Sequence, residues 1–190
     1  LCSGLSMLIF LTLSIQFVRF GNYVWALLAA CVLGIAAAFF MYNAFGKRLK
    51  IFMGDGGSLT LGYVAAFLCL KMITLAQTTT PPTDDITPVT LMALVFIPLY
   101  DMLRLFIARM WKGHSPFTPD KNHIHHKFLQ LGYTHLQSTG MIMLVQACYI
   151  VGNFVAAKWL NINLIFAIDF ITAMLLIGAL ERSAARKGRR

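Results

Sequence analysis

The sequence predicts an all-α integral membrane protein with about six transmembrane helices and one amphipathic helix that lies at the membrane interface. Three observations predict this class: 58% of the 190 residues are hydrophobic, only 12% are charged, and the basic residues gather between the apolar runs. A soluble domain of this size could not bury so much apolar surface, so the bilayer must be the solvent. The net charge of +9 then indicates basic cytoplasmic loops rather than a nucleic-acid-binding surface.

Six apolar segments are long enough to cross a bilayer, which takes about 20 residues of helix. They are Leu1–Val18, Tyr23–Tyr42, Leu59–Leu75, Val89–Met110, Thr139–Ala157 and Ile162–Leu180. Pro98 lies inside the fourth segment and is expected to kink it, which membrane helices tolerate when neighbouring groups satisfy the freed carbonyl. The four cysteines stand singly in apolar segments, which predicts buried thiols rather than disulfides or metal ligands.

The charges between these segments predict the orientation. Residues 43–57, residues 111–138 and the tail 181–190 are basic, whereas Thr78–Pro88 carries two aspartates and no Lys or Arg. Six spans place the three basic regions on one side of the membrane, and the positive-inside rule makes that side cytoplasmic. We therefore expect residues 1–190 to form a single membrane domain whose polar motifs all face the cytoplasm.

The cytoplasmic region 111–138 contains the most informative motif, three histidines within the four residues 123–126. Thr118, Pro119 and Asp120 have the character of a helix start, and Gly132 that of a helix end. About three turns of helix are therefore predicted between them. At 100° per residue, the helix carries one polar and one apolar face, a pattern typical of an interfacial helix. The polar face holds His123, His126, Lys127 and Gln130, and the apolar face holds Ile124, Phe128 and Leu131.

Two functional interpretations and one structural interpretation compete for this segment. The imidazoles and Lys127 suit a diphosphate, helped by helix N–H groups. Alternatively, His123 and His126 stand three apart and suit a transition metal, although no cysteine or nearby carboxylate pair completes a tetrahedral site. The third interpretation is an interfacial helix with solvated histidines, which three histidines in four residues disfavour. His114 and His135 are expected to be ordinary loop residues.

A second motif, Phe52–Ser58, lies where the chain re-enters the membrane. Its glycines, Gly54, Gly56 and Gly57, permit a close approach of the backbone to a ligand. The carboxylate of Asp55 suits Mg²⁺, which prefers oxygen ligands and usually keeps waters and substrate phosphates around it. The alternative is that Asp55 or Ser58 merely caps the N-terminus of the third span.

Two aspartates lie inside predicted spans, where ionisable residues are costly and are functional candidates. Asp101 is three residues before Arg104, so it either pairs with this arginine or belongs to the site. Asp169 lies near the middle of the last span, and the sequence offers it no partner.

Three motifs together resemble the polyprenyl-phosphate N-acetylhexosamine-1-phosphate transferases, most closely the WecA-like branch of that family. They are Phe52-Met53-Gly54-Asp55-x-Gly57-Ser58, Ile97-Pro98-Leu99-x-Asp101 and Ser115-Pro116-Phe117-x-Pro119-Asp120-x-x-His123-Ile124-His125-His126. The resemblance covers most of residues 43–132. It implies transfer of a sugar 1-phosphate from a UDP-N-acetylhexosamine to undecaprenyl phosphate at the bacterial inner membrane, with release of UMP and a need for Mg²⁺ or Mn²⁺.

The resemblance also implies roles for individual residues. Asp55 would be a metal ligand, and the three histidines His123, His125 and His126 would bind the diphosphate or the nucleotide in the catalytic site. Asn43 is similar to an asparagine on the uridine side. Arg109 falls where that family carries a basic residue and would contact phosphate. The residues themselves add Gly54, Gly57, Ser58 and Lys127 as further candidates for substrate-phosphate binding.

The chain departs from that family in one respect, because the family's other acidic motifs lie upstream of the first span seen here. We therefore expect the chain to be the C-terminal half of a longer enzyme and to be inactive without the N-terminal half. The His-Ile-His-His form favours N-acetylglucosamine as the sugar. The alternative function is a non-enzymatic membrane protein that binds or transports metal through the histidine cluster.

Overall fold

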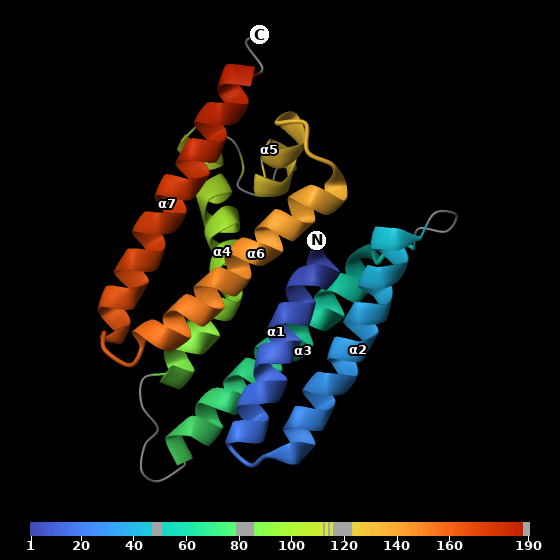
Figure 1. Ribbon diagram of the computed structural model, residues 1–190, viewed down its shortest axis with the longest axis vertical. Helices are drawn as coiled ribbons and strands as arrows, with labels where there is room; N and C mark the ends of the chain where they lie inside the picture. Colours follow the sequence, from blue (N-terminus) through green and yellow to red (C-terminus); the bar gives the residue numbers. More distant parts are fainter. Residues whose placement is uncertain (47–50, 79–85, 112, 114, 116–122, 188–190) are drawn as a thin grey trace. The chain divides into compact units, whose positions relative to one another are not determined.

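The computed structural model describes residues 1–46, 51–78, 86–111, 113, 115 and 123–187. Within these residues the chain forms seven helices and no strand (Figure 1). They are α1 (Cys2–Arg19), α2 (Tyr23–Phe45), α3 (Gly54–Thr78), α4 (Ile86–Trp111), α5 (Ile124–Gln130), α6 (His135–Ala156) and α7 (Ile162–Lys187). All except α5 are long and apolar enough to cross a membrane, which confirms the predicted all-α membrane class.

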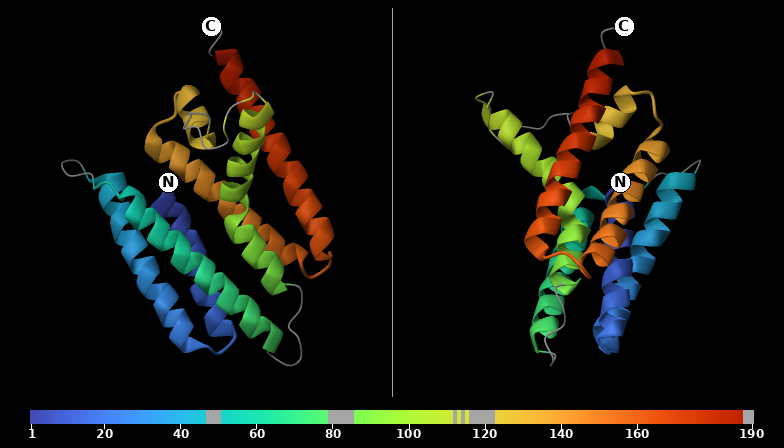
Figure 2. Two further views of the ribbon diagram at one scale, coloured as in Figure 1. Left: turned by 180° about the vertical axis from the view of Figure 1, so that it is seen from behind. Right: turned by 60° about the vertical axis from the view of Figure 1, so that its left-hand side comes forward.

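The first compact unit comprises residues 1–94 and is built on α1, which packs against both α2 and α3 (Figure 2). Phe10, Leu13 and Phe17 follow one face of α1 and are fully buried. Ala26 and Ala29 are among the few buried residues of α2. Small residues at such a contact let helix backbones approach closely, which is the usual basis of helix packing in a membrane.

The second compact unit comprises residues 95–190, in which α5 packs against α6 and α7. Two side-chain hydrogen bonds join α6 to α7. The amide of Asn153 donates to Oδ2 of Asp169 over 2.6 Å, and the hydroxyls of Tyr149 and Thr172 lie 2.8 Å apart. Asp169 is buried, and Asn153 is the hydrogen-bonding partner that a carboxylate needs inside a membrane helix bundle.

The prediction that the four cysteine thiols are buried is wrong. All four are free, Cys2, Cys31 and Cys148 are exposed on their helices, and Cys69 is half-buried. Helices that are apolar on every side give no sequence signal that separates a surface facing lipid from one facing protein. The helix α2 illustrates this, because only 17% of its most apolar stretch is buried.

All six membrane helices extend past at least one predicted boundary, and two do so by five residues or more. The third begins at Gly54 rather than Leu59, and the last ends at Lys187 rather than Leu180. Hydropathy reports the stretch that the bilayer can hold, whereas the helix continues into water with polar residues. The glycine and aspartate motif is therefore the first turn of α3, not a turn before it.

Candidate functional site

The histidine helix α5 is shorter than predicted. It has seven residues, and His123 stands before it at the N-cap with φ −57° and ψ 152°. The predicted start at residues 118–120 lies outside the described residues. The prediction that His123 shares a helical face with His126 is wrong, because His123 has an extended backbone. The predicted end is confirmed, since Gly132 has a φ of +89° directly after the C-cap Leu131, where glycine is favoured.

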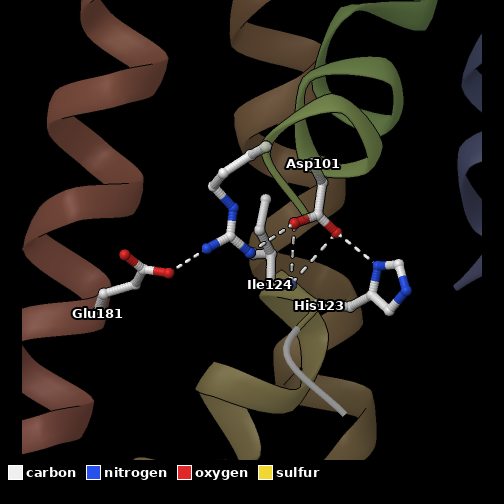
Figure 3. A network of polar contacts seen from close by, with 5 residues as sticks. Asp101, His123, Ile124 and Glu181 are labelled. Carbon is white, nitrogen blue, oxygen red and sulfur yellow. Dashed lines mark hydrogen bonds and ion pairs between the residues drawn. The ribbon is translucent and has the colours of Figure 1, made fainter. Parts of the chain in front are cut away.

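Asp101 on α4 fixes the start of α5 (Figure 3). Its Oδ2 lies 3.0 Å from Nδ1 of His123, and its two carboxylate oxygens each lie 3.3 Å from the backbone nitrogen of Ile124, which donates to them. The first N–H groups of a helix have no partner within the helix. The carboxylate therefore caps α5 and orients His123 at the same time.

An arginine connects Asp101 to the last helix. Nη2 of Arg104 donates to Oδ1 of Asp101 over 3.0 Å, and Nη1 of Arg104 pairs with Oε1 of Glu181 on α7. The side chains of Asp101 and Arg104 are only 14% and 17% exposed, whereas that of Glu181 is 44% exposed. The predicted pairing of Asp101 with Arg104 is confirmed. Asp101 also contacts the histidine segment, and its membership of the functional site stays a prediction.

His135 is not an ordinary loop residue, which corrects that prediction. It is the first residue of α6, and its Nδ1 lies 3.1 Å from Nε2 of His125. The two rings stack with centroids 5.4 Å apart, and the ring of His126 stands edge-on to His125 at 5.8 Å. Burial, followed by the neighbouring His135, lowers the pKa of His125 from its usual 6.5.

We expect the contact between His125 and His135 to weaken in acid. A histidine with a lowered pKa binds fewer protons when folded than when unfolded, so its contribution to stability falls as the pH drops below 6.5. NMR titration of ¹³C-labelled histidine, assigned with His125→Gln, should show His125 titrating below 6.5. His135→Gln removes one repulsive charge but not the burial, so the pKa should rise part of the way. A titration of His125 at or above 6.5 would contradict this expectation.

The first turn of α3 carries Asp55, whose exposed side chain makes no polar contact within the described part of the chain. Ser58 does not cap the helix as the alternative interpretation predicted, since its hydroxyl donates to the carbonyls of Gly54 and Asp55 over 3.2 and 3.1 Å. Gly54 has a φ of +64°, a backbone conformation that favours glycine. At Gly57 the space is limited, because a Cβ there would lie 2.7 Å from Cγ of Met53.

Asn43, near the end of α2, is tied to the segment that leads into α3. Its amide donates to the carbonyl of Ile51 over 2.8 Å and accepts from the backbone N–H of Ile51 over 2.9 Å. The expected contact with uridine stays a prediction, and the structure gives the side chain a local role in holding the approach to Asp55.

The other predicted contacts lie in the second unit. Arg109 is in the last turn of α4, with its guanidinium carbon 6.0 Å from the ring centroid of Phe106. Lys127 is half-buried in α5. The second unit thus brings together Asp101, His123, His125 and the unexpected His135, while Asn43 and Asp55 belong to the first unit.

Two residues of α7 that contact this site were missed from the sequence. Glu181 reaches Arg104, and Nζ of Lys187 donates to the carbonyl of Leu131 over 2.6 Å. The sequence pattern indicates Lys187 only as one of several basic residues in the tail 181–190. A signal for Glu181 did exist, because it is the single acidic residue among the ten residues of that tail.

Comparisons with known proteins agree with the predicted family. The model of glycosyl transferase family 4 matches residues 1–73. An undecaprenyl-phosphate alpha-N-acetylglucosaminyl 1-phosphate transferase of Salmonella typhi is 34% identical over 176 residues, which is 87% of this chain and 46% of that protein. Proteins of the same name from Yersinia pestis and Escherichia coli K12 are 31% and 36% identical, over 100% and 70% of this chain and 51% and 37% of theirs.

The chain spans about half the length of the curated relatives it matches. No solved structure matches it. The helical membrane fold, the motifs around Asp55 and the histidines, and these similarities point to one conclusion. The chain belongs to glycosyl transferase family 4.

Proposed function

We propose that the protein carrying this chain transfers N-acetylglucosamine 1-phosphate from a UDP-sugar to undecaprenyl phosphate at the cytoplasmic face of the bacterial inner membrane. The observation that carries the proposal is the histidine segment, which Asp101 holds by 3.0 and 3.3 Å contacts. The names of the relatives support both the acceptor and the sugar.

The proposed reaction exchanges one phosphoric anhydride for another. An oxygen of the lipid phosphate attacks the β-phosphorus of the UDP-sugar, the bond from that phosphorus to the bridging oxygen breaks, and UMP leaves with the electron pair. Such a transfer depends mainly on positioning and on neutralising charge. His123, His125 and His126 would hold the diphosphate, with Lys127 and Arg109 adding positive charge. Asn43, Gly54, Gly57 and Ser58 would shape the nucleotide side.

The residues present fit a magnesium or manganese ion that has one protein ligand from this chain. The carboxylate of Asp55 has no competing polar contact within the described residues, and those residues contain no group of three or more ligand side chains. Mg²⁺ commonly takes one or two carboxylates and completes its shell with water and substrate phosphates. When bound, it would neutralise part of the charge on the diphosphate.

The proposal is tested with membranes isolated from cells that express the complete open reading frame containing this sequence. Incubation with undecaprenyl phosphate and UDP-N-acetylglucosamine should release UMP and form the lipid-linked sugar, while UDP-N-acetylgalactosamine should react more slowly. EDTA should stop the reaction, and Mg²⁺ or Mn²⁺ should restore it. Membranes from cells with the empty vector are the control. Metal uptake without any sugar transfer would instead support the rival metal transporter.

A further inference from the structure

The last helix, α7, is connected to both ends of the histidine helix. At the start of α5, Glu181 binds Arg104, which binds Asp101, which in turn accepts the N–H of Ile124 and contacts His123. At the end of α5, the ammonium group of Lys187 donates to the carbonyl of Leu131 over 2.6 Å. The apolar side of α5 lies between these two links. Ile124 and Phe128 of α5 line a cavity together with Ile177 and Leu180 of α7.

The part of α7 from Glu181 to Lys187 is about as long as α5. Seven residues of α5 rise roughly 10 Å, and the six residue steps from Glu181 to Lys187 rise roughly 9 Å, at 1.5 Å per residue. The stretch of α7 between the two linked residues therefore matches the length of α5. A helix of seven residues is too short to be stable by itself, so its position depends on contacts of this kind.

Each link satisfies a group that the short helix leaves without a partner inside it. The carboxylate of Asp101 accepts an N–H group at the positive end of α5, and the ammonium of Lys187 binds a carbonyl at the negative end. Gly132 makes room for the second link, because a Cβ at this position would lie 2.9 Å from Nζ of Lys187. Opposite charges thus meet the two ends of the helix dipole.

We propose that Glu181 and Lys187 are positioning residues, which set the place of His123, His125 and His126 without touching substrate. The inference rests on the proposed function, because it assigns to α7 the alignment of the histidines for phosphate transfer. Displacing reacting groups by about 1 Å costs on the order of a hundredfold in rate, so a modest loosening of α5 should be measurable.

The test uses the complete open reading frame with Glu181→Gln, Lys187→Met and the double variant. The peptide that trypsin releases by cutting after Lys127 reports the loosening of α5, because Lys127 is half-buried in that helix. Steady-state kinetics with UDP-N-acetylglucosamine report alignment. Arg182→Gln is the matched control, since this exposed neighbour on α7 makes no polar contact within the described residues.

Each single variant should lower kcat by about fivefold, with KM changed less than twofold. For Glu181→Gln this is the usual upper range for a partly exposed ion pair, and for Lys187→Met it is the usual size of a single hydrogen bond. Each should also speed cleavage after Lys127 by a similar factor. The double variant should exceed the product of the two effects, since α5 then loses both links. Glu181→Asp and Lys187→Arg should recover most of the activity, and Arg182→Gln should match the wild type in both measurements.

The two readouts separate this inference from the proposed function. Faster cleavage in a protein that transfers no sugar would show that the links exist and that the function is wrong. Faster cleavage with an unchanged kcat would overturn the positioning role. Cleavage no faster than in Arg182→Gln would overturn the links themselves.

Discussion

Replacing Asp55 by asparagine should lower UMP release by two to three orders of magnitude, the range found when one group that stabilises transition-state charge is removed. The side chain is exposed in the first turn of α3 and has no polar partner within the described part of the chain. The carboxylate lies at the positive end of the α3 dipole, where its charge contributes only about 0.3–1 kcal/mol of stability, so its loss should affect activity far more than folding. Asparagine keeps the shape of the side chain but has no negative charge to offer a hard cation.

The measurement is UMP release at increasing Mg²⁺ or Mn²⁺ by the protein from the complete open reading frame. Asp55→Glu keeps the charge and should retain part of the activity, with a raised metal requirement. Thr60→Ala is the control within the same helix, since the hydroxyl of Thr60 is exposed and donates only to the carbonyl of Gly56, over 2.7 Å. Near-normal turnover by Asp55→Asn would refute the metal role.

Replacing Asp101 by leucine should have the second largest effect, a loss of about thirtyfold in kcat. The change removes the acceptor of the Ile124 N–H, the partner of His123 and one of the two carboxylates that hold Arg104. Removing one member of a buried ion pair costs roughly 3–5 kcal/mol. Asp101 and Arg104 retain slight exposure, so the cost should be smaller, about 2 kcal/mol. If the misplaced histidines lose this much stabilisation of the transition state, kcat falls about thirtyfold.

Hydrogen exchange of the Ile124 amide provides a direct measurement of this effect. The amide should exchange faster in Asp101→Leu, because the carboxylate that accepts its hydrogen bond is gone. Asp101→Asn is the matched variant: its amide oxygen still accepts the Ile124 N–H, so both exchange and activity should fall between those of the wild type and the leucine variant. Wild-type kcat together with accelerated exchange would show that the capping is real but irrelevant to catalysis.

The secondary structure of this protein was predictable because the bilayer imposes a single strong rule. A span needs about 20 apolar residues, and its polar backbone groups must be satisfied within the helix. The six spans follow from this rule, with ends that differ from the observed helix ends by up to seven residues. The end of α5 was also predictable, because Gly132 takes a backbone conformation that glycine favours.

The prediction for the candidate site was less complete, because periodicity describes one helix at a time. The helical period predicts that His123 lies on the face of a longer helix. In the structure His123 is at the N-cap, where the carboxylate of Asp101 on α4 contacts it. The sequence pattern predicts that His135 is a loop residue, although its ring stacks on His125. Both differences come from contacts between residues at least 10 positions apart in the chain.

The sequence by itself determined the membrane class, the number of spanning helices and the motifs that mark the family, because each depends on residue type and local spacing. Only the tertiary structure decided which charges meet. Arg104 could have paired with Asp101 alone, but the packing of α7 beside α5 adds Glu181 and brings Lys187 to Leu131. Ion pairs between distant segments depend on where packed helices place their side chains, and local sequence patterns do not predict these positions.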